Sequence, residues 1–363
     1  MNREKWIDLL RGFCMMSILW FHTEMYYVGY DKTPYTFYVG DVLAVFFIIS
    51  GYLLYKPTSI DFNKRIHSIF RYIVLPYFIF TTFIAIEKYF FYQDRSISLL
   101  IIDVLSGHAS WFITALIISQ LIFLLFLRIT KENIIFLAVL SCFSLILSYY
   151  IGNSYNPSPL YYEQNIWHLN EALFACFLLF TGYFYHRYER IINYINTIIY
   201  TSLLFIIVCI IKYIIYKNNM QLVLGPIIVS NYPIFIIDLL CSSLLLIQIF
   251  KRLPSIKMIE WTGAHSIVYY FLCGGIPVVI STIFHHMNIT DNSYLYILGV
   301  FIVVYLVSTG VTWLIYRYIP FISRKKLNAG AQLNSSIFSI GLTASFAILG
   351  STSMEGHSCF RQL

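Results

Sequence analysis

Apolar stretches long enough to cross a bilayer recur along the whole chain, from residue 7 to residue 318. A transmembrane helix needs about 20 mostly apolar residues, because the hydrocarbon core of a bilayer is about 30 Å thick. The composition agrees, since only 11% of the residues are charged, against roughly 25% in soluble domains. Runs such as residues 99–127 lack the two-residue alternation of a transmembrane β-strand. The sequence therefore excludes a water-soluble globule and predicts an all-α, polytopic integral membrane protein.

The apolar windows predict about ten transmembrane helices in one membrane domain, residues 5–318. The rest, residues 319–363, is expected to be a cytoplasmic tail, because its apolar piece is too short to cross a bilayer. The predicted helices lie at residues 7–28, 37–55, 70–92, 110–128, 133–151, 166–185, 193–216, 226–250, 262–284 and 294–317.

The positions of Lys and Arg predict the orientation of these helices. Seventeen of them fall on connections that would lie on one side of the membrane, and five on the other. Cytoplasmic loops carry the excess of Lys and Arg, so both termini are predicted to be cytoplasmic. The net charge of +7 is therefore interpreted as an orientation signal, and we expect the lipid bilayer, not nucleic acid, as the partner.

Charged and titratable side chains within the first span are the most informative polar residues, because polar groups are costly in a bilayer. Asp8 and Arg11 are three residues apart, and His22 follows Arg11 by eleven residues. Eleven residues make about three helical turns, so Arg11 and His22 share a face about 16 Å apart. This spacing suits a cation at the cytoplasmic mouth of a cavity and an imidazole deeper in it. The alternative is that Arg11 anchors the helix and His22 hydrogen-bonds a neighbouring helix.

Several separate elements along the chain form a recognisable set. They are Asp8, Arg11 and His22 in the first helix, Phe46-Phe47-Ile48-Ile49-Ser50-Gly51-Tyr52-Leu53 in the second, the basic loop with Arg65, Arg71 and Pro76-Tyr77, Trp111-Phe112 after His108, and Gly263-Ala264-His265-Ser266 before Ile267-Val268-Tyr269. Together these elements resemble the bacterial membrane acyltransferase-3 family, which O-acetylates cell-surface and secreted polysaccharides. The resemblance covers roughly residues 5–318. One departure is Cys273, which stands where the family often has a histidine.

The resemblance implies an O-acyltransferase of the bacterial inner membrane. It would transfer an acetyl or related acyl group from cytoplasmic acetyl-CoA to a hydroxyl of a glycan or lipid-linked sugar. Acetyl-CoA would be a co-substrate, and the reaction would need no metal. His22 would act as a general base or as a transient acyl carrier, and Asp8 would hold Arg11 in place. The cofactor-binding residues would be Arg65, Arg71 and Ser50, with guanidinium groups suited to phosphates.

Further polar residues are candidates for binding the acceptor. His108 and Trp111 could form a sugar-binding surface, although Trp is also a common interfacial anchor. His168 and Glu171 lie on one helix face, as a sugar-binding pair or as a surface pair at the headgroups. Asp238 falls midway along a span, where an unpaired carboxylate is expensive. We therefore expect it to bind substrate or to belong to a polar network.

Two other functions fit part of the same pattern. A transporter or flippase for a glycan precursor would use Asp238 and His22 as proton-coupling groups, and Gly225-Pro226 and Gly274-Gly275 could interrupt its helices. A non-catalytic assembly partner would tolerate substitution of every intramembrane charge. The sequence has no Gly-rich phosphate loop, GxSxG element, HExxH or CxxC pair.

Overall fold

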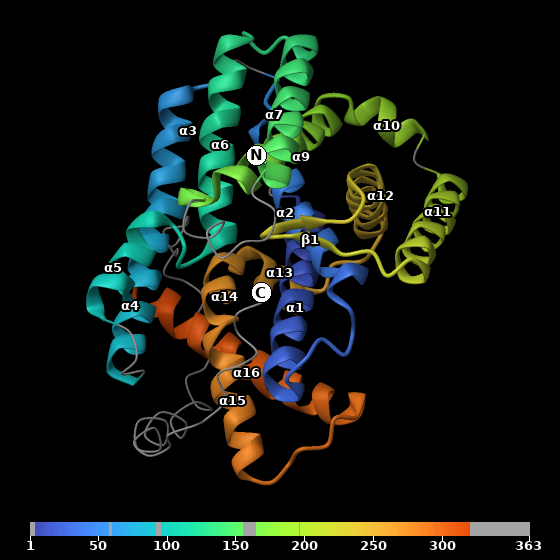
Figure 1. The fold of residues 1–363 in the computed structure, drawn as a ribbon. Helices are drawn as coiled ribbons and strands as arrows, with labels where there is room; N and C mark the ends of the chain where they lie inside the picture. Colours follow the sequence, from blue (N-terminus) through green and yellow to red (C-terminus); the bar gives the residue numbers. More distant parts are fainter. Residues whose placement is uncertain (1–3, 58–59, 92–95, 155–164, 196, 320–363) are drawn as a thin grey trace.

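The structure, a computed structural model, describes residues 4–57, 60–91, 96–154, 165–195 and 197–319. Most of this part of the chain is helical (Figure 1). The helices and turns of helix are α1 (Lys5–Val28), η1 (Tyr35–Phe37), α2 (Val39–Leu54), α3 (Phe62–Ile69), η2 (Phe70–Val74), α4 (Leu75–Phe91), α5 (Ile97–Ser106), α6 (Trp111–Ile129), α7 (Ile134–Ser154), η3 (Ile166–His168), α9 (Leu169–Arg187), α10 (Glu189–Ile195), α11 (Ile198–Lys217), α12 (Tyr232–Phe250), α13 (Lys257–Ala264), α14 (Ser266–Leu272), α15 (Gly275–His286) and α16 (Tyr294–Tyr318).

The prediction of a helical, multi-pass membrane protein is confirmed. Helices occupy all ten of the segments predicted to be helical. In the described part of the chain, six helices are long and apolar enough to cross a membrane, or seven if α14 and α15 form one span. The count of ten crossings and the cytoplasmic position of the termini stay predictions, and the tail from residue 320 lies outside the described residues.

Three differences from the helices that the apolar windows predict change the course of the chain. The eighth helix begins at Tyr232, and not at residue 226, because the preceding residues form a hairpin of β1 (Leu222–Leu224) and β2 (Ile227–Val229). This hairpin is a small departure from the all-α prediction. The side chain of Asn231 accepts a hydrogen bond from the Ile234 amide and so caps α12 at its start.

The other two differences concern helix continuity. The third helical rod begins earlier than predicted, at Phe62, and contains a π-helical turn, Phe70–Val74. The predicted span at residues 262–284 is divided into three short helices, and α14 and α15 are bent by 46° relative to one another. Gly274 and Gly275 lie at this bend, in agreement with the expectation that they interrupt a helix.

Helices α1 and α2 lie in the middle of the molecule, and the other helices pack around them (Figure 1). The most extensive contacts join α2 to α9 and α1 to α13. At the α2–α9 crossing the two backbones touch, since a Cβ on Gly51 would overlap the Leu179 carbonyl and a Cβ on Gly182 would overlap the Ile48 carbonyl. Small residues allow such close packing in membranes, where dispersion replaces the hydrophobic effect between helices.

Helix α11 lies at the edge of the molecule and packs mainly on α12 (Figure 1). Most of its apolar side chains are exposed in the described structure, as expected for a helix that faces lipid. Its polar residue Lys212 is an exception, because the side chain turns inward.

Candidate functional site

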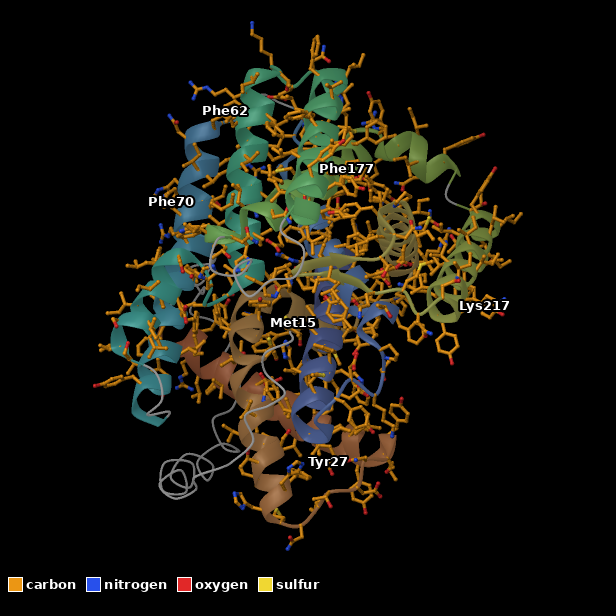
Figure 2. The ribbon with its side chains drawn as sticks, in the orientation of Figure 1. Met15, Tyr27, Phe62, Phe70, Phe177 and Lys217 are labelled. Atoms are coloured by element: carbon orange, nitrogen blue, oxygen red, sulfur yellow. The ribbon has the colours of Figure 1, made fainter. Side chains whose placement is uncertain are left out.

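Helix α1 presents its polar stripe to the interior of the protein. Met15 and Ile18, which lie between Arg11 and His22 on the same face, are 1% and 3% exposed, and Figure 2 shows Met15 in the interior. Asp8 is buried, whereas Arg11 and His22 are half-buried. The stripe therefore faces neighbouring helices and not lipid, as its periodicity predicts.

The imidazole of His22 lies among aromatic rings in the outer half of α1. Its ring centroid is 5.5 Å from that of Phe21 and 6.1 Å from that of Tyr26, with which it stacks. Phe21 in turn contacts Tyr35. Within the described residues the His22 nitrogens make no hydrogen bond or ion pair. The alternative that His22 hydrogen-bonds a neighbouring helix does not hold for this part of the chain.

Ser50 and Arg65 both interact with the backbone of α2. The Ser50 hydroxyl donates to the Phe46 carbonyl at 2.7 Å, a bond within the helix. Arg65, from α3, donates from Nη2 to the Leu53 carbonyl at 2.9 Å. The guanidinium therefore caps the C-terminal end of α2, where a cation is favourable.

Arg71 lies in a different environment from Arg65. It belongs to the π-helical turn and is exposed, on the outer flank of the molecule where Figure 2 labels Phe70. Arg71, His67 and apolar side chains line a groove of about 660 Å³. Neither Arg71 nor His67 has a carboxylate partner among the described residues. The groove is lined by His67, Phe70, Arg71, Val74, Leu75 and Phe78.

His108, His168 and Glu171 are brought together at the ends of three helices. The rings of His108 and His168 are 5.6 Å apart and meet edge to face. His168 Nδ1 lies 3.5 Å from Glu171 Oε2, and that oxygen also accepts from Asn165 Nδ2 at 2.6 Å. His168 is 3% and Glu171 2% exposed, so the interpretation as a surface pair at the headgroups is wrong.

The loop before α9 has an unusual backbone that makes this cluster possible. Trp167 and His168 have φ values of 55° and 50°, in the left-handed region that favours glycine. Their segment packs against Gly107, where a Cβ would lie 2.9 Å from the Trp167 Cα. Strained backbone of this kind costs about 1–3 kcal/mol and concentrates at functional sites.

Trp111 is part of the same region but is not an exposed anchor. It is half-buried, and its indole covers the hairpin turn so closely that a Cβ on Gly225 would overlap the ring. Phe112, the next residue, contacts Tyr270 of α14 at 5.2 Å. The start of α6 therefore joins the hairpin to the helices that pack on α1.

Asp238 belongs to a buried ion network that joins three helices. Lys212 Nζ lies 2.7 Å from Asp238 Oδ2 and 2.6 Å from Asp41 Oδ2, and it also donates to the Thr36 carbonyl. Both carboxylates are buried. The two aspartates come from α2 and α12, and the lysine comes from α11. Asp238 is in a polar network, one of the two alternatives left open.

Glu24, near the outer end of α1, is also buried. Its carboxylate accepts hydrogen bonds from the Thr33 amide and the Thr33 hydroxyl, each at 3.1 Å. Glu24 as a whole is 0% exposed. It therefore fixes the loop that leads from α1 towards η1. In that loop, burial raises the pKa of the Tyr35 hydroxyl, so this group is a neutral donor at neutral pH.

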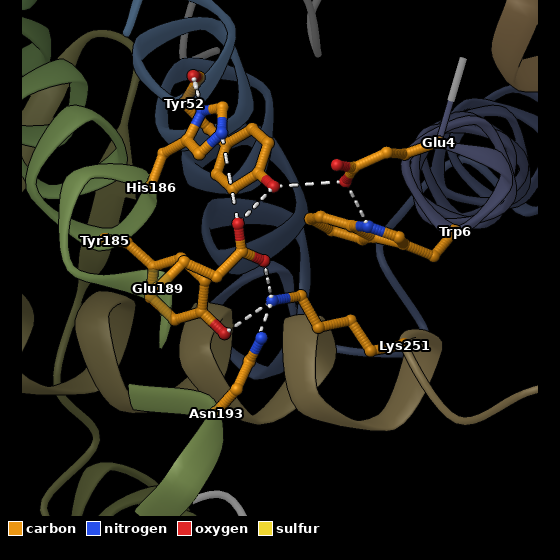
Figure 3. Close-up of polar contacts among 8 residues, drawn as sticks. All are labelled: Glu4, Trp6, Tyr52, Tyr185, His186, Glu189, Asn193 and Lys251. Atoms are coloured by element: carbon orange, nitrogen blue, oxygen red, sulfur yellow. Dashed lines mark hydrogen bonds and ion pairs between the residues drawn. The ribbon is translucent and has the colours of Figure 1, made fainter. Parts of the chain in front are cut away.

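A second network, absent from the sequence analysis, joins the start of α1 to α2, α9, α10 and the end of α12 (Figure 3). At its centre the Tyr52 ring stacks on the His186 ring at 3.9 Å, and His186 Nδ1 donates to the Tyr52 carbonyl at 2.7 Å. Tyr52 lies within the resembling element of the second helix, which is the signal that could have drawn attention to it. The members are Glu4, Trp6, Tyr52, Tyr185, His186, Glu189, Asn193 and Lys251.

The predicted site residues therefore do not form a single cluster. Arg11 and His22 lie on one face of α1, while His108, Trp111, His168 and Glu171 lie around the start of α6 and α9. Asp238 lies in its ion network, and Arg65 and Arg71 lie on different faces of the third rod. Within the described residues, no three His, Cys, Asp or Glu side chains are placed to hold a metal ion.

Comparison with known proteins gives one match. Residues 4–317 match the model of the acyltransferase-3 family, described as an acyltransferase domain. No curated protein and no solved structure matches the chain. The matched residues cover nearly the whole described structure, from the start of α1 to the end of α16. With its membrane-spanning helices and the polar stripe of α1, the chain belongs to the acyltransferase-3 family of membrane acyltransferases.

Proposed function

We propose that the protein is a membrane O-acyltransferase that moves an acetyl or related acyl group from cytoplasmic acyl-CoA to a hydroxyl of a cell-surface glycan or a lipid-linked sugar. In this proposal it is a multi-pass protein of the bacterial inner membrane. The observation that carries the proposal is the polar stripe of α1. There His22, which has no hydrogen-bond partner in the described structure, shares a buried face with Arg11.

The donor would bind on the side that the basic connections mark as cytoplasmic. The groove beside Arg71 combines a guanidinium that has no carboxylate partner among the described residues with the imidazole of His67 and an apolar lining. This suits a ligand that has phosphates at one end and a less polar arm. Arg11 and Arg65 are further donor contacts in the proposal, and the Ser50 hydroxyl would lie beside the acyl arm.

The reaction that His22 would support is the attack of a sugar hydroxyl on the thioester carbonyl. As the new C–O bond forms, the imidazole takes the hydroxyl proton. The C–S bond then breaks, and the departing thiolate takes the proton from the imidazolium, so charge and protons balance. If His22 is instead an acyl carrier, the imidazole nitrogen attacks the carbonyl first, the C–S bond breaks and CoA leaves as the thiolate. The sugar hydroxyl then attacks the acyl-imidazole, the C–N bond breaks, and the hydroxyl proton passes to the thiolate. In both routes the thioester is already activated, so the protein supplies positioning and proton transfer.

The acceptor would bind where His108, His168 and Glu171 meet, beside Trp111. The buried pair of His168 and Glu171 offers a donor and an acceptor, and the left-handed backbone of His168 holds the ring in place. Indole faces also stack on sugar rings. These features support an acceptor site at the start of α6 and α9.

A transporter or flippase is the alternative, and the buried network of Asp41, Lys212 and Asp238 favours it. Buried ion pairs in membrane spans are common in proton-coupled transport. Purified protein in liposomes separates the two functions. Transfer of labelled acetyl from acetyl-CoA to a sugar acceptor supports the enzyme. Movement of the acceptor across the bilayer without acyl transfer supports the transporter and overturns the proposal.

A further inference from the structure

Lys212 uses every donor of its ammonium group within the buried network that it forms with Asp41 and Asp238. Its Nζ lies 2.6 Å from Asp41 Oδ2 and 2.7 Å from Asp238 Oδ2, and it donates to the Thr36 carbonyl at 3.2 Å. An ammonium group has three protons to donate, so Lys212 has no donor left for the other oxygens. Asp41 Oδ1 and Asp238 Oδ1 are both buried without a hydrogen-bond partner in the described part of the chain.

The charges of this network do not balance. Two carboxylates face one ammonium group, so the network carries one excess negative charge when both aspartates are ionised. Asp41 is 5% and Asp238 2% exposed, and no second cationic side chain of the described residues forms an ion pair with either of them. A buried charge without a partner is expensive, because the interior of a protein solvates it far less well than water does. The network is therefore expected to take up one positive charge.

A hydroxyl group lies beside the two unpaired carboxylate oxygens. Ser242 follows Asp238 by four residues on α12 and so lies on the same face of that helix. Ser242 is 5% exposed, and its Oγ lies beside both carboxyl groups without completing a hydrogen bond to either. Buried polar atoms are normally paired, and carboxylate and hydroxyl oxygens are the ligands that hard cations prefer. Three unpaired oxygens at one place therefore indicate a binding position for a cation.

We propose that Asp41, Asp238 and Ser242 form a binding site for one monovalent cation, either Na⁺ or a proton, which neutralises the excess charge. Na⁺ would be bound by the two Oδ1 atoms and the Ser242 hydroxyl, whereas a proton would be bound by one of the Oδ1 atoms. A divalent ion does not suit the site, because it would give the network an excess positive charge. Among the described residues fewer than three His, Cys, Asp or Glu side chains meet here, which also argues against a transition metal.

Binding of the cation should be visible as a change in stability. Helix α11 carries Lys212 but is otherwise weakly attached, since only 6% of its most apolar window is buried. The network joins α11 to α2 and α12, so an uncompensated charge weakens this attachment and a bound cation strengthens it. A ligand that binds only the folded protein stabilises it. The midpoint of thermal unfolding therefore reports binding, whether or not the protein is an enzyme.

The first experiment measures thermal unfolding of the full-length protein in detergent, with Na⁺ exchanged for choline at constant ionic strength. Constant ionic strength keeps general screening equal in every sample. If Na⁺ is the ligand, the midpoint of the native protein should rise by about 2 °C for each tenfold increase in Na⁺ above its Kd. Asp238→Asn should show no such rise, because it removes the excess charge while it keeps the size of the side chain. The matched control is Asp291→Asn, at an exposed residue, which should respond to Na⁺ like the native protein.

The second experiment measures the same midpoint in choline between about pH 5.5 and 8.5. If a proton is the ligand, the folded protein holds a proton that the unfolded chain releases, so stability is highest at low pH and falls as the pH rises. This fall should exceed that of Asp238→Asn, in which the network is neutral throughout the range. The other titratable groups that face the two carboxyl groups are the Tyr35 hydroxyl and the thiols of Cys14 and Cys241. They stay protonated in this range, because burial favours their uncharged forms.

Two results would overturn the cation site. One is a native midpoint that Na⁺ does not raise and that depends on pH no more than the midpoint of Asp238→Asn does. The other is a rise with Na⁺ that is as large in Asp238→Asn as in the native protein, since the ion then acts elsewhere. Asp41→Asn makes the same charge change from the other helix and should match Asp238→Asn, so the test does not depend on the folding of a single variant. Acyl transfer is not measured, so the proposed function stands or fails separately.

Discussion

Gly12 on α1 and Gly263 on α13 meet backbone to backbone. A Cβ added to Gly12 would overlap the Ile259 carbonyl, and one added to Gly263 would overlap the Asp8 carbonyl. This close crossing holds the polar stripe of α1 against α13. The two glycines belong to elements that resemble the acyltransferase-3 family, and the crossing supplies a physical reason for glycine at both positions.

Gly263→Ala should therefore destabilise the protein, by about 1–3 kcal/mol, the usual cost of forcing a methyl group into a packed contact. Thermal unfolding in detergent measures this as a lower midpoint. Gly310→Ala is the matched control, because no atom lies within 4 Å of a Cβ at that position in α16. Equal midpoints for the two variants would show that α1 and α13 can separate without cost.

His22→Ala should abolish acyl transfer while the protein still inserts in the membrane. The loss of a general base lowers rates by about 10²–10⁴-fold, and loss of an acyl carrier is at least as severe. The measurement is acetate released by mild base from the cell's polysaccharide, with membrane levels of the protein checked by immunoblot. His286→Ala, at the exposed end of α15, should behave like the native protein. Normal acetate release by His22→Ala would refute its catalytic role.

Charge reversal at Arg65 together with Arg71 should weaken acetyl-CoA binding more than acceptor binding. Because Arg65 caps α2 and Arg71 lines the groove, the single reversal at Arg71 should account for most of the loss, about tenfold or more in Kd. Calorimetry with a non-hydrolysable acetyl-CoA analogue measures it. Lys64→Glu, the same charge change on an exposed residue of α3, is the control. An unchanged donor affinity in the double variant would place the donor on another loop.

Lys212→Met should destabilise the protein by about 3–5 kcal/mol, because it leaves two buried carboxylates without their cation. Lys217→Met, on an exposed residue of the same helix, should have little effect on the midpoint of thermal unfolding. Asp238→Asn combined with Lys212→Met should be less unstable than Lys212→Met alone, since it removes one of the orphaned charges. Additive losses in the double variant would contradict the coupling of these residues.

Local patterns predicted a large part of the fold. Ten apolar windows correspond to helices because hydrophobic runs and helical periodicity are properties of neighbouring residues. The buried stripe of Arg11, Met15, Ile18 and His22 on α1 followed from the same periodicity. The boundary at α12 was misplaced because the hairpin residues, Leu222–Leu224 and Ile227–Val229, are as apolar as a membrane span, so hydropathy alone cannot separate strand from helix.

The polar networks depended on long-range contacts. Asp238 was identified because a carboxylate stands out in an apolar run, but its partners Lys212 and Asp41 come from two other helices. The network around Tyr52 joins residues from position 4 to position 251. No periodicity relates such positions, because helix packing and not sequence spacing brings them together.

The sequence by itself determined the membrane environment, the helical class and the inward face of α1, because hydrophobicity and helical periodicity act between near neighbours. The tertiary structure decided which charges neutralise one another, where glycines allow backbones to touch, and that His168 and Glu171 are buried. Those features depend on distances between helices that lie far apart in the chain, and only the packed bundle sets these distances.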